Sequence, residues 1–521
     1  MKIVRLTVTL LLLVICINLS RAQQENIDTT AIHKIRDAEV KSSNIPVLAF
    51  HLTDAAGSRL TNSPGFYRAG NYIVAVMKSW GLSHVVYEPW GEYGRGWEPE
   101  VFSISMQVPY QASVIAYPEP WSANTNGAIR APLYQLLYTD MVDPAYFEKH
   151  KKDFSGKIIL LTNSNVQHDT DDFQPFARRL TDSELTHMQD YFYFSRKQLE
   201  DLHQQDVQVN EGKLRLKAAG ALAVVIADGN NRDGTLVVEA PDGYEKDHSV
   251  LLPEAAISAE DGFKIKRLLA SGQKVEFALN IQGKFYADDT KGYNLIAELP
   301  GTDPKLKDEL VIIGAHLDSW NAATGATDNA AGCVVMMEAI RLLDSLHLAP
   351  KRTIRIILWS GEEEGMLGSY NYVKNHFGNA ETGILKPEQT KISAYFNLDD
   401  GTGKIRGIFA QGNTAIQPIF KYWLAPFKDL GATTVTLSNS GSTDHESFDW
   451  VGIPAFQFIQ DPLDYIIKTH HSNMDTYDYL RIEDLKQSAI IVASLIYQVG
   501  MRTELLPRKK MIKEKFHWEG M

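Results

Sequence analysis

The sequence predicts an α/β fold in which a mostly parallel sheet is flanked by helices. From about residue 294 onward, short β-branched runs alternate with longer helical patterns, which is typical of a parallel sheet covered by helices. Polar residues follow the carboxyl ends of these runs, where open α/β sheets place their ligand sites. A chain of 521 residues exceeds what one hydrophobic core usually organises, so a second domain or a large insertion is expected.

The strands and helices of this domain are predicted from the spacing of apolar residues and from the turn residues between the runs. We expect strands at residues 294–299, 309–315, 353–359, 392–398 and 453–459. Residues 329–346 carry apolar side chains at helical spacing and predict a helix, and residues 365–377 predict another. The resulting order is strand, helix, strand, helix, strand.

Residues 112–286 have a different sequence pattern. Runs at 157–162, 221–227 and 275–281 predict strands, whereas residues 180–213 are charged and helical in pattern. No cluster of catalytic type stands out in this region. We therefore predict an inserted, β-rich, noncatalytic domain at 112–286, with residues 23–111 and 287–521 together forming the main domain.

The N-terminus predicts export. Lys2 and Arg5 precede an apolar run at residues 6–19, and small residues at Ser20 and Ala22 suit cleavage after Ala22. A membrane anchor is the rival interpretation, but the run is shorter than the roughly 20 apolar residues that a spanning helix needs. Residues 1–22 are thus predicted to be a signal peptide, and the mature chain to be secreted or periplasmic.

Composition excludes some partners. The formal net charge is −12, which argues against nucleic acid. No later run is long and apolar enough to predict stable membrane insertion. The mature chain would hold one cysteine, Cys333, so no internal disulfide can form. Oligomeric state is not readable from the sequence; a homodimer is one state that it allows.

The first chemical motif is His316 with Asp318 at a strand end. Period-two alternation sends both side chains to one face. His316 can bind a metal through one ring nitrogen while Asp318 orients it, directly or through the local network. Alone, this pair is more often structural.

The second motif is Asp328, which lies among the small residues of 325–332 and opens a helix. Small neighbours allow close approach to a metal centre, and the two oxygens of a carboxylate can bridge two ions. The alternative is an ordinary helix N-cap, for which Asp is common.

Three adjacent acids, Glu362, Glu363 and Glu364, follow the apolar strand at 353–359. Adjacent buried carboxylates repel one another unless cations neutralise them. A solvated acidic turn is the alternative, but the preceding run leads from the interior of the sheet. Asp399 is another acid that follows a predicted strand, and His471 lies on a polar loop at 470–476.

Two histidines and several carboxylates suit zinc. Two ions about 3.5 to 4 Å apart could share Asp328, activate a bridging water and polarise a scissile carbonyl. A further carboxylate must accept the proton of the water, and one of the three adjacent glutamates should do so.

Together, these motifs resemble the co-catalytic double-zinc aminopeptidase family, and within it the carboxypeptidase Q subgroup. The similar segments are 316–320, 325–332, 350–353, 359–369 and 470–472. The family resemblance implies a zinc exopeptidase fold of the phosphorylase/hydrolase-like class. One departure is Ala331, where many relatives carry Ser, but this is not a ligand position.

The resemblance also implies the ligands. One zinc would be bound by His316, Asp328 and Asp399, and the other by Asp328, Glu363 and His471. Both ions would then share Asp328.

Three further roles are implied. Glu362 matches the general base of the family, Asp318 would orient His316, and Glu364 would be a bystander. A cis peptide often follows the bridging aspartate in this family, here between residues 328 and 329. The insertion looks like a protease-associated domain at 156–161 and 218–221.

The leading hypothesis is a zinc exopeptidase that cleaves peptides or dipeptides next to a free N-terminus, as an aminopeptidase or a carboxypeptidase Q-like dipeptidase. Two alternatives stay open. A noncatalytic, receptor-like ectodomain shares this architecture but loses ligands, and a glutaminyl cyclase-like enzyme keeps the zinc chemistry and changes the reaction.

Overall fold

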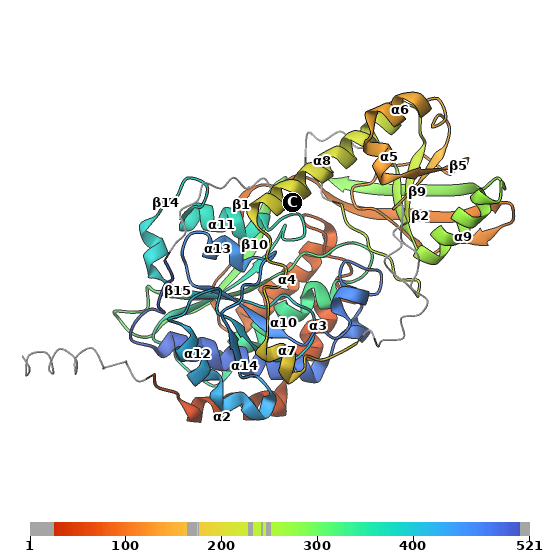
Figure 1. The fold of residues 1–521 in the computed structure, drawn as a ribbon. Helices are drawn as coiled ribbons and strands as arrows, with labels where there is room; N and C mark the ends of the chain where they lie inside the picture. Colours follow the sequence, from red (N-terminus) through yellow and green to blue (C-terminus); the bar gives the residue numbers. More distant parts are fainter. Residues whose placement is uncertain are drawn as a thin grey trace, which may run out of the picture.

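The computed structural model describes residues 25–163, 175, 177–227, 233–240, 243–245 and 252–510. The predicted signal peptide at 1–22 lies outside the described residues. Within them, no helix combines the length and the apolar character needed to cross a membrane. The chain forms two units, each built on a sheet (Figure 1).

The first unit contains an eight-stranded sheet whose central strands are parallel. Its spatial order is β1 (Ser83–Glu92), β10 (Lys291–Leu299), β12 (Thr353–Trp359), β11 (Leu310–His316), β15 (Ile392–Asn397), β18 (Ala455–Gln460), β16 (Ile405–Phe409) and β17 (Thr434–Thr436). Strands β12, β11, β15 and β18 run parallel to one another, whereas β1, β10 and β16 introduce antiparallel pairs. The sheet is therefore mixed, with a parallel centre.

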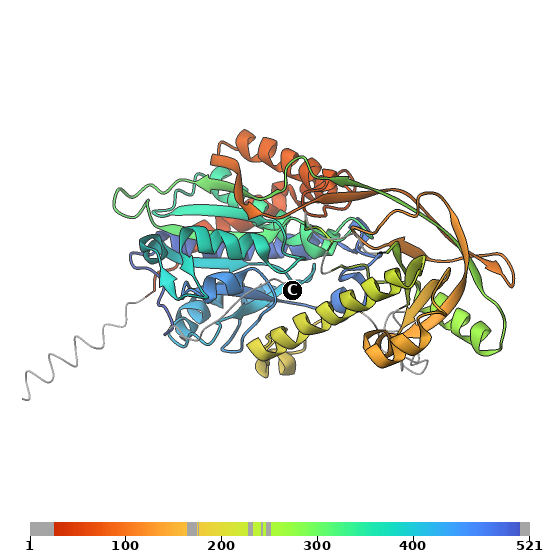
Figure 2. The same cartoon turned by 90° about the horizontal axis from the view of Figure 1, so that it is seen from above.

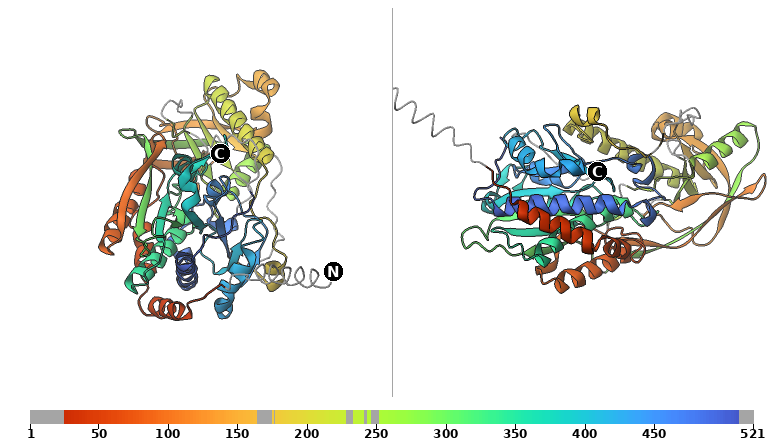
Figure 3. Two further views of the ribbon diagram at one scale, coloured as in Figure 1. Left: turned by 90° about the vertical axis from the view of Figure 1, so that its left-hand side faces the viewer. Right: turned by 90° about the horizontal axis from the view of Figure 1, so that it is seen from below.

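Helices cover both faces of this sheet. One face packs against α2 (Thr29–Ser42), α3 (Ile45–Leu52), α4 (Pro64–Ser79), α10 (Ala331–Ser345), α12 (Gln417–Leu424) and α14 (Ile482–Met501). The other face packs against α11 (Leu367–His376) and α13 (His445–Asp449). Alternation along β11 divides its side chains, since Val311 and Ile313 face the first layer and Ile312 the second. Figure 3 shows α2 and α14 side by side.

The second unit is a separate eight-stranded sheet. Its order is β3 (Ala112–Ser113), β2 (Gly96–Val108), β9 (Glu276–Tyr286), β5 (Ile129–Leu137), β6 (Ile158–Thr162), β7 (Ala223–Ala227), β8 (Glu254–Ile257) and β4 (Ala116–Pro118). Helices α5 (Tyr138–Val142), α6 (Pro144–His150) and α9 (Ala259–Ala270) accompany it. Strand β2 pairs with β9 in this sheet, so the chain changes sheet before residue 96, earlier than the predicted boundary at 111/112.

Residues 180–213 differ from the single charged helical segment that their pattern predicts. They contain a short helix, α7 (Asp182–Thr186), an irregular stretch at 187–195, and most of the long helix α8 (Arg196–Ala218). The interruption arises because Tyr191 pairs with the main chain of residues 439–441 in the first unit. Figure 2 shows α8 running from the second unit alongside the first.

Candidate metal centre

The candidate site lies where parallel strands of the first sheet end. His316 is the last residue of β11, the Glu362–Glu363 pair follows β12, and Asp399 follows β15. The carboxyl ends of parallel strands meet at one edge of a sheet, so these side chains converge. His471 comes from the loop after β18, beyond a π-helical turn at Tyr465–Thr469.

Asp328 is held in the middle of this group by its main chain. It lies in the turn at Ala326–Ala330 that precedes α10, where its own backbone angles, φ −128° and ψ 92°, are not helical. The carboxylate of Asp475 accepts hydrogen bonds from the amides of Thr327 (2.6 Å) and Asp328 (3.1 Å). The peptide bond from Asp328 to Asn329 is cis, as the resemblance implies. At Gly332, an added Cβ would lie 2.2 Å from the carbonyl oxygen of Leu398, so only glycine permits this approach.

The two carboxylate oxygens of Asp328 face different histidines. Oδ1 lies 3.1 Å from Nε2 of His316, and Oδ2 lies 3.5 Å from Nε2 of His471. On the first side, Oδ1 of Asp399 lies 3.2 Å from the same His316 nitrogen. On the second side, Oε2 of Glu363 lies 3.0 Å from Nε2 of His471. The side chains thus form two sets that meet at Asp328.

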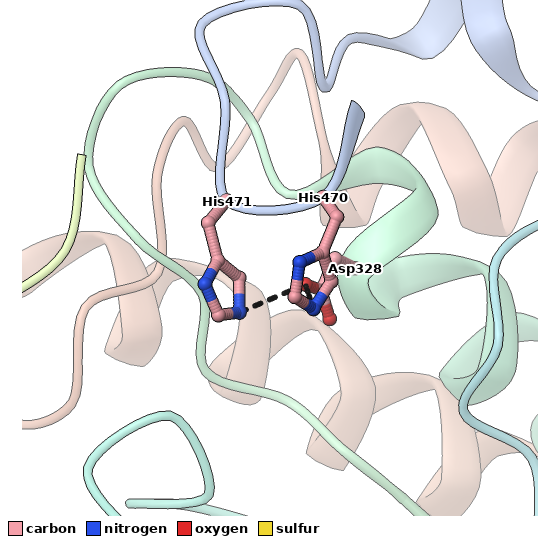
Figure 4. A group of neighbouring side chains, drawn as sticks. All are labelled: Asp328, His470 and His471. Carbon is pink, nitrogen blue, oxygen red and sulfur yellow. Dashed lines mark ion pairs between the residues drawn. The ribbon is translucent and has the colours of Figure 1, made fainter. Parts of the chain in front are cut away.

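His470 lies next to this group and is a competing donor. Its Nε2 is 3.9 Å from Oδ2 of Asp328, and its ring stacks on that of His471 (Figure 4). Within the part of the chain that the structure describes, two groups of side chains are close enough to hold an ion: His316, Asp328 and Asp399, and Asp328, His470 and His471. Only His471, however, also contacts Glu363.

Asp318 contacts His316 mainly through its main chain. Its carbonyl oxygen lies 3.1 Å from Nδ1 of His316, whereas its carboxylate oxygen Oδ1 is 3.7 Å away. The other carboxylate oxygen accepts hydrogen bonds from the amides of Glu362 (3.0 Å) and Glu363 (3.3 Å). Asp318 therefore fixes the turn that presents the two glutamates, in addition to contacting the histidine.

The second unit reaches the site through Glu239. Its Oε2 lies 2.6 Å from Nδ1 of His471, opposite the nitrogen that faces Asp328 and Glu363. The main chain fixes this contact, because the amide of Val238 donates to the carbonyl of His471 (2.9 Å) and the amide of Asn473 donates to that of Leu236 (3.1 Å). The histidine is thus oriented by a carboxylate from the insertion.

The site concentrates negative charge in a buried place. Burial, together with repulsion from Asp328, raises the pKa of Glu363 to about 8. Burial also raises the pKa of Glu362 well above its usual value, although the nearby His316 opposes this. Burial alone would lower the pKa of His316, but Asp399 and Glu362 outweigh it and raise that pKa. Such a cluster of acids and histidines is what a bound cation stabilises.

Two carboxylate oxygens among the candidate ligands have no hydrogen-bond partner within the described residues, which fits metal ligands. Oδ2 of Asp328 and Oε1 of Glu363 are buried and accept no hydrogen bond from the part of the chain that the structure describes. A buried charged oxygen without a partner is costly. The donor set of imidazole nitrogens and carboxylate oxygens matches the ligands of zinc.

A cavity of about 260 Å³ opens beside the acids Asp328, Glu362, Glu363 and Asp399. Its other walls come from Asp400, from His470 and His471, from residues 440–443, from Tyr465 and Ile466, and from the aromatic residues Tyr191, Phe192 and Phe194. Glu362 belongs to neither set of side chains. It lines this cavity, and its Oε2 lies 4.0 Å from Nε2 of His316. A reacting group in the cavity would therefore meet Glu362.

An α/β sheet that gathers histidines and carboxylates at its strand ends, beside a cavity, defines a candidate metal-dependent hydrolase. Residues 294–496 match the model of Peptidase family M28, which confirms the resemblance seen in the motifs.

Two kinds of relative are similar to the chain. Human carboxypeptidase Q is 30% identical over 302 residues, which cover 57% of this chain and 60% of the human protein's own length. The Peptidase M28 precursor from Shewanella amazonensis has a TM-score of 0.69 at 22% identity, over 92% of this chain and 98% of that one. The zinc aminopeptidase BSAP from Bacillus subtilis has a TM-score of 0.58 at 21% identity, over 90% and 98%. The two structures share the fold.

The structure brings together all seven residues predicted for the site: His316, Asp318, Asp328, Glu362, Glu363, Asp399 and His471. Sequence reasoning missed three contributors. Asp475 follows His471 by four residues, so its place in the same motif was a usable signal. Glu239 and Tyr191 lie in the insertion, where no spacing connects them with the strand ends.

Proposed function

We propose that this chain is a metallo-exopeptidase that uses two zinc ions to hydrolyse the peptide bond next to a free N-terminus. The observation that carries the proposal is the position of Asp328, whose two oxygens face separate histidines at 3.1 and 3.5 Å. A carboxylate in this position can bridge two ions. The M28 match and the similarity to carboxypeptidase Q support a peptidase.

In this proposal His316, Asp328 and Asp399 bind one zinc, and Asp328, Glu363 and His471 bind the other. We choose His471 over His470 because it contacts Glu363 at 3.0 Å and is oriented on its far side by Glu239. Asp475 holds the main chain of Asp328 and so fixes the bridge.

Two zinc ions at this site would polarise the substrate carbonyl and acidify a water molecule. Glu362 accepts the proton of the attacking water and returns it to the leaving amine as the peptide bond breaks. Its main-chain amide is held by Asp318, so its carboxylate enters the cavity from a fixed turn. Burial keeps bulk water from competing for this proton.

Two features complete the proposal. The second sheet, with β2, β5, β6, β7 and β9, is a protease-associated domain that borders the active site, supported by the reach of Glu239 to His471. The chain is exported, supported by the pattern of residues 1–22. Sequencing the N-terminus of protein collected from an exporting host should find Gln23 first; a mature protein that keeps Met1 would contradict cleavage.

The experiment combines metal analysis with a peptide panel. Purified mature protein is loaded with zinc, freed of excess and analysed for bound metal. It is then incubated with a free-amine heptapeptide, its N-acetylated copy, several dipeptides and a peptide that begins with glutamine, followed by time-resolved mass spectrometry.

Two zinc ions per chain and cleavage only of substrates with a free amine would support the proposal. Stepwise shortening of the heptapeptide indicates an aminopeptidase, and cleavage of dipeptides alone indicates a dipeptidase. Loss of ammonia from the glutamine peptide without hydrolysis would indicate a cyclase instead. Absence of both metal and turnover would favour a noncatalytic ectodomain.

A further inference from the structure

The stretch 178–194, which we call the strap, leaves the insertion and lies across the first unit. At its start, Arg178 and Leu463 exchange main-chain hydrogen bonds of 3.1 and 2.9 Å. The guanidinium of Arg179 then pairs with Asp461 and Asp484, each at 2.7 Å. The carboxylate of Asp461 is fully buried, so this end of the strap is firmly anchored.

The far end of the strap is anchored on the loop at 438–442. The amide of Tyr191 donates to the carbonyl of Asn439 (2.9 Å), and the amide of Gly441 donates to the carbonyl of Tyr191 (3.0 Å). The hydroxyl of Ser442 donates to the carbonyl of Phe192 (2.9 Å). These bonds use the main chain of the strap, so they hold it in place whatever its side chains are.

The strap contributes aromatic side chains to the cavity beside the acids. Tyr191, Phe192 and Phe194 line it, and the hydroxyl of Tyr191 donates to Asp400 (2.9 Å) on the same wall. Phe192 is 41% exposed although it is a large apolar side chain at a cavity wall. Apolar surface exposed at a concave site favours an apolar ligand.

We propose that Phe192 and Phe194 are specificity-determining residues that bind a bulky apolar side chain of the substrate peptide. The proposal rests on the proposed function, because it concerns the substrate of that site. The reacting bond would lie beside the acids of the cavity, and the aromatic rings that line the same cavity receive the side chain next to it. Aromatic rings suit this role because they bury a large area with few rotatable bonds.

The test uses Phe192→Ala, Phe194→Ala and the double variant, with Tyr193→Ala as the matched control. Tyr193 is a neighbouring, 47% exposed aromatic residue that does not line the cavity. Each zinc-loaded protein is assayed for kcat and KM on two dipeptide series, X-Gly and Gly-X, in which X is Gly, Ala, Leu or Phe. Zinc content and Tm are measured to establish that the strap and the metal site stay folded.

We expect the wild type to prefer Leu or Phe over Gly in one series. The double variant should lose that preference by about 10-fold or more, the scale of apolar side-chain discrimination, mainly through a higher KM for the Leu and Phe substrates. Phe192→Leu should retain part of the preference, and Tyr193→Ala all of it. A wild type that cleaves peptides without such a preference, or a double variant that keeps it, would overturn the inference and leave the proposed function intact.

A binding measurement separates the two proposals if no peptide is cleaved. Leucine hydroxamate and glycine hydroxamate carry the same chelating group, so the ratio of their affinities isolates the side chain. Calorimetry on the zinc-loaded wild type should find leucine hydroxamate tighter by about 10-fold, and the double variant should bind both alike. Equal or absent binding by the wild type, or an unchanged ratio in the double variant, would overturn the role of the strap.

Discussion

Glu239 of the second unit lies 2.6 Å from His471 of the first, at the ring nitrogen opposite the one that faces Asp328. The two residues are 232 positions apart in the chain. The carboxylate fixes both the orientation of the imidazole and the nitrogen that carries its proton. The second unit therefore contributes an orienting carboxylate to a site whose candidate ligands all come from the first sheet and its loops.

This contact predicts that Glu239 controls affinity for one zinc. Glu239→Ala should weaken that ion by about 10–100-fold, the usual effect of removing a carboxylate that orients a histidine ligand. Glu239→Gln keeps an acceptor for the ring N–H of His471 and should lower the zinc affinity by less. Competition with a chromophoric chelator measures both, with Glu211→Gln, at an exposed glutamate of α8, as the control. Equal affinity in Glu239→Ala and the wild type would refute the role.

Glu362 is predicted to act in the proton transfer and not as a ligand. Glu362→Gln should lower kcat by about 10²–10⁴-fold, the range that general acid–base groups contribute, while two zinc ions stay bound. Glu364→Gln is the matched control, because Glu364 is a buried neighbour that does not line the cavity. Turnover is measured alongside zinc content. A Glu362→Gln variant with full kcat would remove this residue from the mechanism.

Zinc binding should release protons. In the metal-free protein, burial and Asp328 raise the pKa of Glu363 to about 8, so this carboxyl is protonated at pH 7. The pKa of His471 is also raised, because Glu363 and Glu239 outweigh the opposing effect of burial. Both groups must give up a proton to bind the metal. Calorimetric titration in buffers of different ionisation enthalpy measures the release; a heat that does not depend on the buffer would contradict it.

A second buried acid pair, far from the metal centre, predicts a pH-dependent stability. Burial, with the adjacent Glu338, raises the pKa of Glu39 to about 8, whereas an unfolded glutamate has a pKa of about 4.3. The folded protein therefore holds a proton that the unfolded chain releases. The stability that this group contributes is present below about pH 4.3 and is lost as the pH rises through about 8.

Glu39→Gln mimics the protonated form and should raise the free energy of unfolding at pH 9, relative to the wild type, by about 1 kcal/mol or more. At pH 5, less than one pH unit above the pKa of the unfolded glutamate, the gain should be several-fold smaller. Urea unfolding of the zinc-loaded proteins at both pH values measures this. Asp37→Asn, at an exposed position of the same helix, is the control. A variant that gains as much at pH 5 as at pH 9 would contradict the assignment.

The centre of the sheet was predictable from the sequence because its strands are short and apolar. Strand β12 has the predicted bounds, 353–359. The helix predicted at 329–346 corresponds to α10, which begins later, at Ala331. Helix α10 begins late because of a contact between residues distant in sequence. The carboxylate of Asp475 accepts hydrogen bonds from the amides of Thr327 and Asp328 and fixes the turn before the helix. Helical periodicity carries no sign of such a contact.

The site was predictable where topology alone brings residues together. His316 ends a central strand, Glu363 and Asp399 each follow one, and parallel strands end at one edge of the sheet. Glu239 and the strap were not predictable, because the position of the insertion depends on packing between two units. Residues 180–213 are an example. Their pattern predicted a charged helical segment, but main-chain pairing of Tyr191 with residues 439–441 interrupts the helix.

The most direct test of the central claim is anomalous diffraction from crystals of the zinc-loaded protein, recorded on both sides of the zinc absorption edge. We predict two peaks about 3.5–4 Å apart, one beside His316 and Asp399 and one beside Glu363 and His471, with Asp328 between them. A single peak, or a second peak bound by His470 in place of His471, would contradict the site as we describe it.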